Sequence, residues 1–205
     1  MRKNFHMKKY LDTTLTPQER AEALADEMTV EEMAGQLRFD APAIDRLGIP
    51  AYNWWNEGLH GLARSGTTTM FPQAIALAAM FDTELVRKAG EITSLETRAK
   101  YSTYSKHGDR DIYKGLTLWA PNINIFRDPR WGRGHETYGE DPYLTAENGK
   151  AYVKGLQGEE KLSVQPPAQS ILQSTAAPKL SATSLMHRCP KRSLKKHIFP
   201  HLKPL

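Results

Sequence analysis

The feature that most constrains this chain is an abrupt change of composition near residue 160. Every Gly, Trp and Tyr lies before residue 161, whereas residues 161–205 contain eight Lys or Arg and no Asp or Glu. Subtracting these eight charges from the net charge of +5 leaves −3 for residues 1–160. A segment dominated by Pro, Ser, Gln, Lys and His, with weak periodicity, cannot bury enough apolar surface to fold. We therefore expect a globular fold within residues 1–160 and a disordered basic tail over 161–205.

Residues 1–160 alternate helical signals with short apolar runs that are typical of strands. Helix N-caps are predicted at Thr16, Thr29, Asp82 and Asp141, and a small apolar helix is predicted over 72–80. Buried strands are predicted over 48–53 and 116–120. Strands that alternate with helices indicate an α/β fold with a parallel sheet. The apolar spacing places five residues on the inner face of the helix that starts at Asp82, namely Leu85, Val86, Ala89, Ile92 and Leu95.

The composition is that of a soluble globular protein, with 40% apolar and 25% charged residues. Cys189 is the single cysteine, so the chain cannot form an intramolecular disulfide. The basic start of the chain lacks the apolar stretch of a secretory signal, and the apolar runs are far shorter than a membrane span. We expect a cytoplasmic protein that binds neither membrane nor nucleic acid.

Two clusters of aromatic and charged residues follow the predicted strands. The first covers residues 52–61, and the second lies within residues 119–142. Loops that follow strands are where α/β folds place their ligand sites. Aromatic rings stack on the apolar faces of a sugar, and charged groups make strong hydrogen bonds to its hydroxyls. The two clusters therefore suit a carbohydrate ligand.

Each cluster also has a structural interpretation. Arg127, Asp128, Arg130 and Glu136 are candidates for an ion-pair network that holds a loop in place. Trp54 and Trp55 are candidates for the core. For Glu57, beside His60, a ligand role and a structural role stay open on these grounds. A glycosidase also needs two carboxylates that flank one bond, and neither cluster identifies such a pair.

Residues 52–61, 70–73 and 119–142 together resemble the N-terminal domain of glycoside hydrolase family 3, with the motifs in the same order and spacing. The resemblance covers about residues 12–160. It implies a TIM-like (β/α)₈ barrel and a retaining exo-acting β-xylosidase or β-glucosidase, with no cofactor or metal. It also implies an aspartate nucleophile late in the barrel and a glutamate acid/base in the next domain. No catalytic residue is therefore assigned within these 205 residues.

The resemblance assigns two substrate-binding residues, Glu57 and Arg133. Glu57 falls where the family binds the far hydroxyls of the terminal sugar, and many glucosidases of the family have Asp there. Glu reaches about one methylene further and would crowd a hydroxymethyl group, which favours a pentose. The expected substrate is therefore a β-linked oligosaccharide or aryl glycoside, with xylose favoured over glucose. Arg127, Asp128 and Arg130 match the loop scaffold of the family.

After residue 158 the resemblance stops, and the genetic code suggests why. Residues 165–179 can be encoded so that the same bases, read from the third base, give AACAKHFAVHSGPE, which is similar to the next segment of the family. We therefore expect a frameshift near residues 160–165. Residues 1–160 would then be the incomplete N-terminal portion of a barrel, with an open sheet edge and uncovered apolar faces. This chain by itself is expected to be inactive.

Two other classes of function are compatible with parts of the sequence. One is a non-catalytic carbohydrate-binding fragment, which would retain part of the sugar site. The other is a basic-tailed protein that binds nucleic acid or a membrane surface through residues 161–205. Against it, Phe199 is the only Phe, Trp or Tyr of that tail, and the tail lacks an amphipathic stripe. The sequence predicts no oligomeric state.

Overall fold

The computed structural model describes residues 8–158 of the chain. Within them, residues 8–38 belong to one compact unit and residues 39–158 to a second. The predicted basic tail over 161–205 and the predicted change of reading frame lie outside the described residues.

The first unit is helical and begins its helices at the predicted caps. It contains the 3-10 helix η1 (Lys9–Leu11) and the helices α1 (Pro17–Glu27) and α2 (Val30–Gly35). Thr16 accepts a hydrogen bond from the backbone of Glu19, whose carboxylate accepts one from the Thr16 backbone in return. The same reciprocal pair joins Thr29 and Glu32. Both capping boxes are confirmed, since each needs partners only three residues apart.

The strands of the second unit are shorter than the sequence predicts. Strand β1 (Asp40–Ala41) pairs antiparallel with β2 (Tyr52–Asn53), with Asp40 opposite Asn53. The predicted strand over 48–53 is therefore wrong in its first half, where Gly48 closes the 3-10 helix η2 (Asp45–Leu47) with a φ of 68°. The predicted strand over 116–120 is reduced to a single parallel bridge between Leu118 and Asn56.

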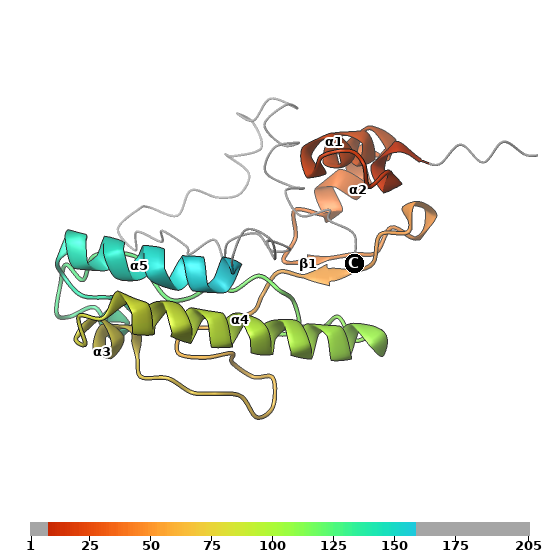
Figure 1. Cartoon of the computed structure of the whole chain (residues 1–205). Coiled ribbons are helices and arrows are strands. Elements are labelled where there is room, and N and C mark those ends of the chain that lie inside the picture. Colours follow the sequence, from red (N-terminus) through yellow and green to blue (C-terminus); the bar gives the residue numbers. More distant parts are fainter. Residues whose placement is uncertain (1–7, 159–205) are drawn as a thin grey trace, which may run out of the picture. The chain divides into compact units, whose positions relative to one another are not determined.

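The helices of the second unit are α3 (Ala74–Ala78), α4 (Thr83–Lys106) and α5 (Pro142–Gln157), with the 3-10 helix η3 (Gly134–Glu136) before α5. Helices α4 and α5 lie side by side and run in the same direction (Figure 1). Asn56 and Leu118 form a parallel bridge. Along the chain, α3 and α4 lie between these two residues, and α5 follows Leu118. The described residues of this unit are therefore a mixed arrangement of helices and short strands. The predicted parallel sheet is reduced to one bridge, and the two strands that pair, β1 and β2, are antiparallel.

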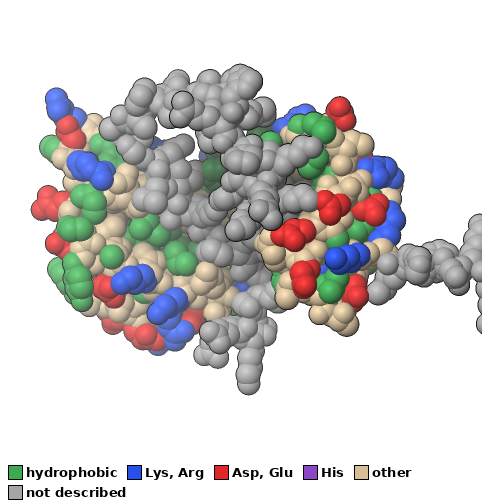
Figure 2. All heavy atoms as spheres, turned by 90° about the horizontal axis from the view of Figure 1, so that it is seen from above, with side chains coloured by type: hydrophobic (Ala, Val, Ile, Leu, Met, Phe, Trp, Pro, Cys, Tyr) green, Lys and Arg blue, Asp and Glu red, His purple; other side chains and the backbone are tan. Residues whose placement is uncertain are grey.

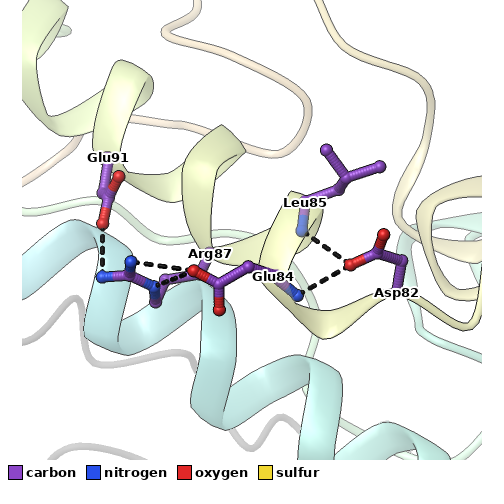
Figure 3. Close-up of polar contacts among 5 residues, drawn as sticks. All are labelled: Asp82, Glu84, Leu85, Arg87 and Glu91. Atoms are coloured by element: carbon purple, nitrogen blue, oxygen red, sulfur yellow. Dashed lines mark hydrogen bonds and ion pairs between the residues drawn. The ribbon is translucent and has the colours of Figure 1, made fainter.

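The start of α4 is fixed by short-range polar contacts (Figure 3). Oδ1 of Asp82 accepts hydrogen bonds from the backbone N–H groups of Glu84 and Leu85, at 3.0 Å each. Arg87 then forms ion pairs with Glu84 at 2.9 Å and with Glu91 at 2.6 Å. The predicted cap at Asp82 is confirmed.

The buried face of α4 differs from the predicted one. Val86 and Ala89 are buried, but the side chains of Leu85, Ile92 and Leu95 are 47%, 40% and 69% exposed. The other buried positions of α4 are small or hydroxylated, namely Gly90, Thr93, Ser94 and Thr97. A Cβ at Gly90 would lie 2.6 Å from the carbonyl oxygen of Tyr152, so the two helices pack too closely for large side chains. The physical cause is the close approach of α5, which apolar periodicity does not encode.

The core of the second unit lies between α3, α4, α5 and the bridged segment at Leu118. It contains eleven buried residues: Leu62, Ala74, Leu77, Ala78, Val86, Ala89, Leu118, Tyr138, Ala151, Tyr152 and Leu156. Lys or Arg and Asp or Glu side chains are interspersed on both units in the face that Figure 2 shows. None of the helices in the part of the chain described here has the length and apolarity needed to cross a membrane.

Candidate substrate-binding site

The charges of the two predicted substrate-binding residues act on each other in the structure. Glu57 is partly buried on the segment that follows β2, and Arg133 directly precedes η3. The hydrogen bond to Glu136 and, more weakly, the charges of Glu136 and Glu57 raise the pKa of Arg133. Glu57 is therefore close enough for its charge to act on the guanidinium. These two side chains come from the two separate clusters of the sequence.

The backbone below Glu57 is held by Asn56, which is almost fully buried. Nδ2 of Asn56 donates to the carbonyl of Gly115 at 2.7 Å, and its Oδ1 accepts from the Glu57 N–H at 2.8 Å. The Asn56 carbonyl accepts from the N–H of Trp119 at 2.9 Å. Asn56 therefore joins the two clusters, a role that the sequence analysis missed because nothing in the sequence predicts its burial.

His60 has a structural contact in this structure. Its Nδ1 lies 3.0 Å from the carbonyl oxygen of Phe71, and the Phe71 N–H donates to the His60 carbonyl at 2.7 Å. These two contacts close the loop between His60 and Phe71. On the other side of that loop, the carboxylate of Glu96 on α4 accepts hydrogen bonds from the backbone and hydroxyl of Thr69. Of the charged or ionisable residues in the first cluster, Glu57 is thus the better candidate for a ligand contact.

The turn that carries Arg133 is held by contacts of Gly134 and of the Glu136 backbone. Phe126 lies against Gly134, where an added Cβ would overlap the ring. Oγ1 of Thr137 donates to the Gly134 carbonyl at 2.7 Å, and the Asn122 N–H donates to the Glu136 carbonyl at 3.1 Å. The position of η3 is therefore set by its backbone and by close packing.

Arg127, Asp128 and Arg130 make local contacts in the same loop. Asp128 and Arg130 form an exposed ion pair at 2.7 Å. Nη1 of Arg127 donates to Oδ1 of Asn124 at 2.7 Å and to the Ile125 carbonyl at 3.2 Å. These contacts are local, and Glu136 pairs with Arg133 instead of joining them. The expected ion-pair network is thus two separate pairs.

Aromatic rings surround the first cluster. Trp55 stacks on Trp119, with ring centroids 5.8 Å apart and an angle of 17° between the planes. Phe39 and Trp55 form a T-shaped pair with ring centroids 6.1 Å apart, and Nε1 of Trp119 donates to the Trp54 carbonyl. Trp55 is 40% exposed and Trp54 is partly buried, so neither is an ordinary core residue.

Metal-ligating side chains do not gather in the described part of the chain. Between residues 8 and 158, no group of three or more His, Cys, Asp or Glu residues is placed to hold a metal ion. The described side chains of the site are a carboxylate, a guanidinium, amides and aromatic rings, which are suited to binding sugar hydroxyls and ring faces.

Residues 13–174 match the model of the glycosyl hydrolase family 3 N-terminal domain. The chain belongs to glycosyl hydrolase family 3. The match extends to residue 174, whereas the resemblance predicted from the sequence ends at about residue 160. Residues 159–174 lie outside the described part of the structure.

Several relatives of this family 3 chain are named as xylosidases. It is 48% identical over 153 residues to a xylan 1,4-β-xylosidase of Xylanibacter ruminicola. This match covers 74% of this chain and 18% of the relative. It is 45% identical to a probable β-D-xylosidase of Arabidopsis thaliana, covering 72% of this chain and 20% of the relative. The chain thus spans about a fifth of the length of the curated relatives it matches.

Solved structures of a xylosidase and a glucosidase show a similar resemblance. An exo-β-xylosidase of the family, in complex with a xylobiose aziridine activity-based probe, matches with a TM-score of 0.65 and 36% identity. That match covers 78% of this chain and 20% of the xylosidase chain. A β-glucosidase from Erythrobacter marinus matches with a TM-score of 0.57 and 32% identity, covering 74% of this chain and 24% of that one.

Proposed function

We propose that residues 39–158 supply the sugar-binding part of a retaining exo-acting β-glycoside hydrolase. Such an enzyme removes terminal β-xylosyl or β-glucosyl residues from β-linked oligosaccharides or aryl glycosides. The observation that carries this proposal is that Asn56 joins the segments of Glu57 and Trp119, from the two separate clusters, by hydrogen bonds, so that the charge of Glu57 acts on Arg133. A carboxylate accepts hydrogen bonds from sugar hydroxyls and a guanidinium donates to them, so the two groups together offer a sugar both an acceptor and donors.

The fold that we propose is the incomplete N-terminal portion of a TIM-like (β/α)₈ barrel. Two features of the second unit support it. Asn56 and Leu118 form a parallel bridge, as neighbouring barrel strands do, and α4 and α5 run side by side in the same direction (Figure 1). Glu57 follows Asn56 directly, and Arg133 lies on the long segment after Leu118, which corresponds to the side on which barrel enzymes bind substrate.

The sugar that we propose is xylose in preference to glucose. Glu57 is one methylene longer than Asp, and it would crowd the hydroxymethyl group that distinguishes glucose from xylose. The relatives from Xylanibacter ruminicola and Arabidopsis thaliana, both named as xylosidases, support this preference. An extra methylene-sized clash is worth about 1–3 kcal/mol, or roughly 10- to 200-fold in specificity.

The role that we propose for these residues is binding, and the covalent chemistry needs further groups. A retaining glycosidase uses one carboxyl group as nucleophile and a second as acid/base, about 5–5.5 Å apart. Glu57 and Arg133 hold and orient the sugar but supply no such pair. We therefore expect that a polypeptide limited to these 205 residues does not turn over a nitrophenyl β-xyloside.

The experiment that tests this proposal is the substitution Glu57→Asp in the full-length enzyme. We expect kcat/KM to fall for 4-nitrophenyl β-xyloside and to rise for the β-glucoside, which changes the ratio of the two by about 10-fold or more. Glu31→Asp, an exposed residue of α2, is the matched control and should leave the ratio unchanged. An unchanged ratio in the Glu57 variant would remove the basis for the sugar preference.

A further inference from the structure

Arg133 is held by one acidic side chain, that of Glu136. Nε of Arg133 donates to Oε1 of Glu136 at 2.7 Å, and its Nη2 donates to Oε2 at 2.6 Å. Two parallel hydrogen bonds of this kind fix the plane of a guanidinium as well as its position. We infer that Glu136 is a positioning residue for sugar binding, which orients Arg133. This inference rests on the proposed function.

The two partners of this pair differ in how firmly they are held. The side chain of Glu136 is 13% exposed, whereas that of Arg133 is 64% exposed. The backbone N–H of Glu136 donates to the Arg133 carbonyl at 3.0 Å, and its carbonyl accepts from Asn122 at 3.1 Å. Glu136 is thus the fixed partner, and the long Arg133 side chain takes its orientation from it.

The geometry leaves part of the guanidinium available to a ligand. Arginine carries five N–H donors, and Glu136 accepts from two of them through Nε and Nη2. The two N–H groups of Nη1 and one of Nη2 remain for other acceptors. Because the side chain of Arg133 is 64% exposed, these donors can reach the hydroxyls of a bound sugar.

The pair between Glu136 and Arg133 also affects the attraction between Arg133 and Glu57. The charge of Glu57 already acts on Arg133, although Glu136 has the larger effect. Without the Glu136 carboxylate, the guanidinium would be attracted to Glu57 by the uncompensated opposite charge. A direct pair between Glu57 and Arg133 would use the two sugar-binding groups on each other and block both.

The turn does not depend on the Glu136 carboxylate for its shape. Gly134 is packed against Phe126, and Thr137 bonds to the Gly134 carbonyl. The contact with Asn122 uses the backbone of Glu136 and not its side chain. Loss of the carboxylate should therefore change the orientation of Arg133 while the turn persists.

The test uses Glu136→Ala, Arg133→Ala and the double variant in the full-length enzyme, with 4-nitrophenyl β-xyloside as substrate and xylose as inhibitor. We expect Glu136→Ala to raise KM and the inhibition constant of xylose by about 10-fold. If Glu136 acts through Arg133, the double variant should be no weaker than Arg133→Ala alone, because the effects of coupled residues do not add. Glu136→Gln retains one acceptor and should recover part of the affinity.

Asp128→Ala is the matched control, since it breaks the neighbouring exposed pair with Arg130 in the same loop. It should leave KM and the xylose inhibition constant unchanged. Additive effects of Glu136→Ala and Arg133→Ala, or a fall in melting temperature with unchanged KM, would overturn the inference. If Arg133→Ala leaves KM and the xylose inhibition constant unchanged, the proposed sugar-binding function fails. This result differs from the results that overturn the inference about Glu136, so the two failures are distinguishable.

Discussion

The hydroxyl of Tyr152 donates a 2.6 Å hydrogen bond to the carbonyl oxygen of Gly58, although 94 residues separate the two in the chain. Tyr152 lies on α5, and Gly58 directly follows Glu57. Both residues are buried, and a Cβ at Gly58 would lie 2.9 Å from Leu118. This bond therefore ties the segment that carries Glu57 to the helix that follows the second cluster.

Tyr152→Phe removes the donor and leaves the buried Gly58 carbonyl without its partner. We expect the free energy of unfolding to fall by about 1–3 kcal/mol, the cost of an unpaired buried acceptor. Urea titration followed by circular dichroism measures the difference. Tyr143→Phe, on the same helix and 75% exposed, is the control and should change stability by less than about 0.5 kcal/mol. Equal effects of the two variants would contradict the role of the buried bond.

Alkaline pH should destabilise the protein through the same residue. Burial raises the pKa of the Tyr152 phenol from its ordinary value of 10.0 to about 12. Between these values the unfolded chain loses a proton that the folded chain keeps, so stability falls as pH rises from 10 to 12. The loss from this group is on the order of 2 kcal/mol. Between pH 9 and pH 11.5, the free energy of unfolding should fall less in Tyr152→Phe than in the parent protein. Equal falls in the two proteins would exclude the ionisation of Tyr152 as the cause.

Gly90→Ala should destabilise the contact between α4 and α5. A Cβ there would lie 2.6 Å from the Tyr152 carbonyl oxygen and 3.2 Å from Cα of Gly155, which are backbone atoms that cannot move alone. Overpacking of this kind costs about 1–3 kcal/mol, which exceeds the gain of about 1 kcal/mol from the higher helix propensity of Ala. Thermal unfolding of this variant should be compared with that of Gly132→Ala, where an added Cβ meets nothing within 4 Å. A rise in melting temperature for Gly90→Ala would refute the close packing.

The reading frame is open to a direct check. We predict that sequencing the DNA for residues 150–205 and several hundred bases beyond shows one base gained or lost near codon 162. The physical reason is that residues 161–205 lack the acidic residues, glycines and periodicity of the preceding segment. A confirmed frame that encodes residues 161–205 as printed would contradict the prediction.

The helix starts of this protein could be predicted because they depend on contacts within a few residues. Thr16, Thr29, Asp82 and Asp141 each cap a helix through bonds to the next turn. The strands could not be placed as well, because a strand is defined by its partner and not by its own apolar run. The segment over 116–120 consequently retains only the bridge at Leu118.

The sugar-binding roles of Glu57 and Arg133 were assigned by resemblance and stay predictions. The structure adds that the charge of Glu57 acts on the Arg133 guanidinium. Glu136 was placed among structural ion pairs, since its sequence position does not reveal that it holds Arg133. The burial of Asn56 also escaped prediction, because an Asn beside a charged residue is ordinarily exposed.

The sequence by itself determined the caps and the family, because these follow from short-range bonds and long motifs. Only the tertiary structure decided which face of α4 is buried and which residue holds Arg133. Leu95 is exposed while Gly90 is buried, since a backbone approach between α4 and α5 selects small residues over apolar ones. Contacts between residues far apart in the chain, such as Tyr152 with Gly58, depend on how the elements pack.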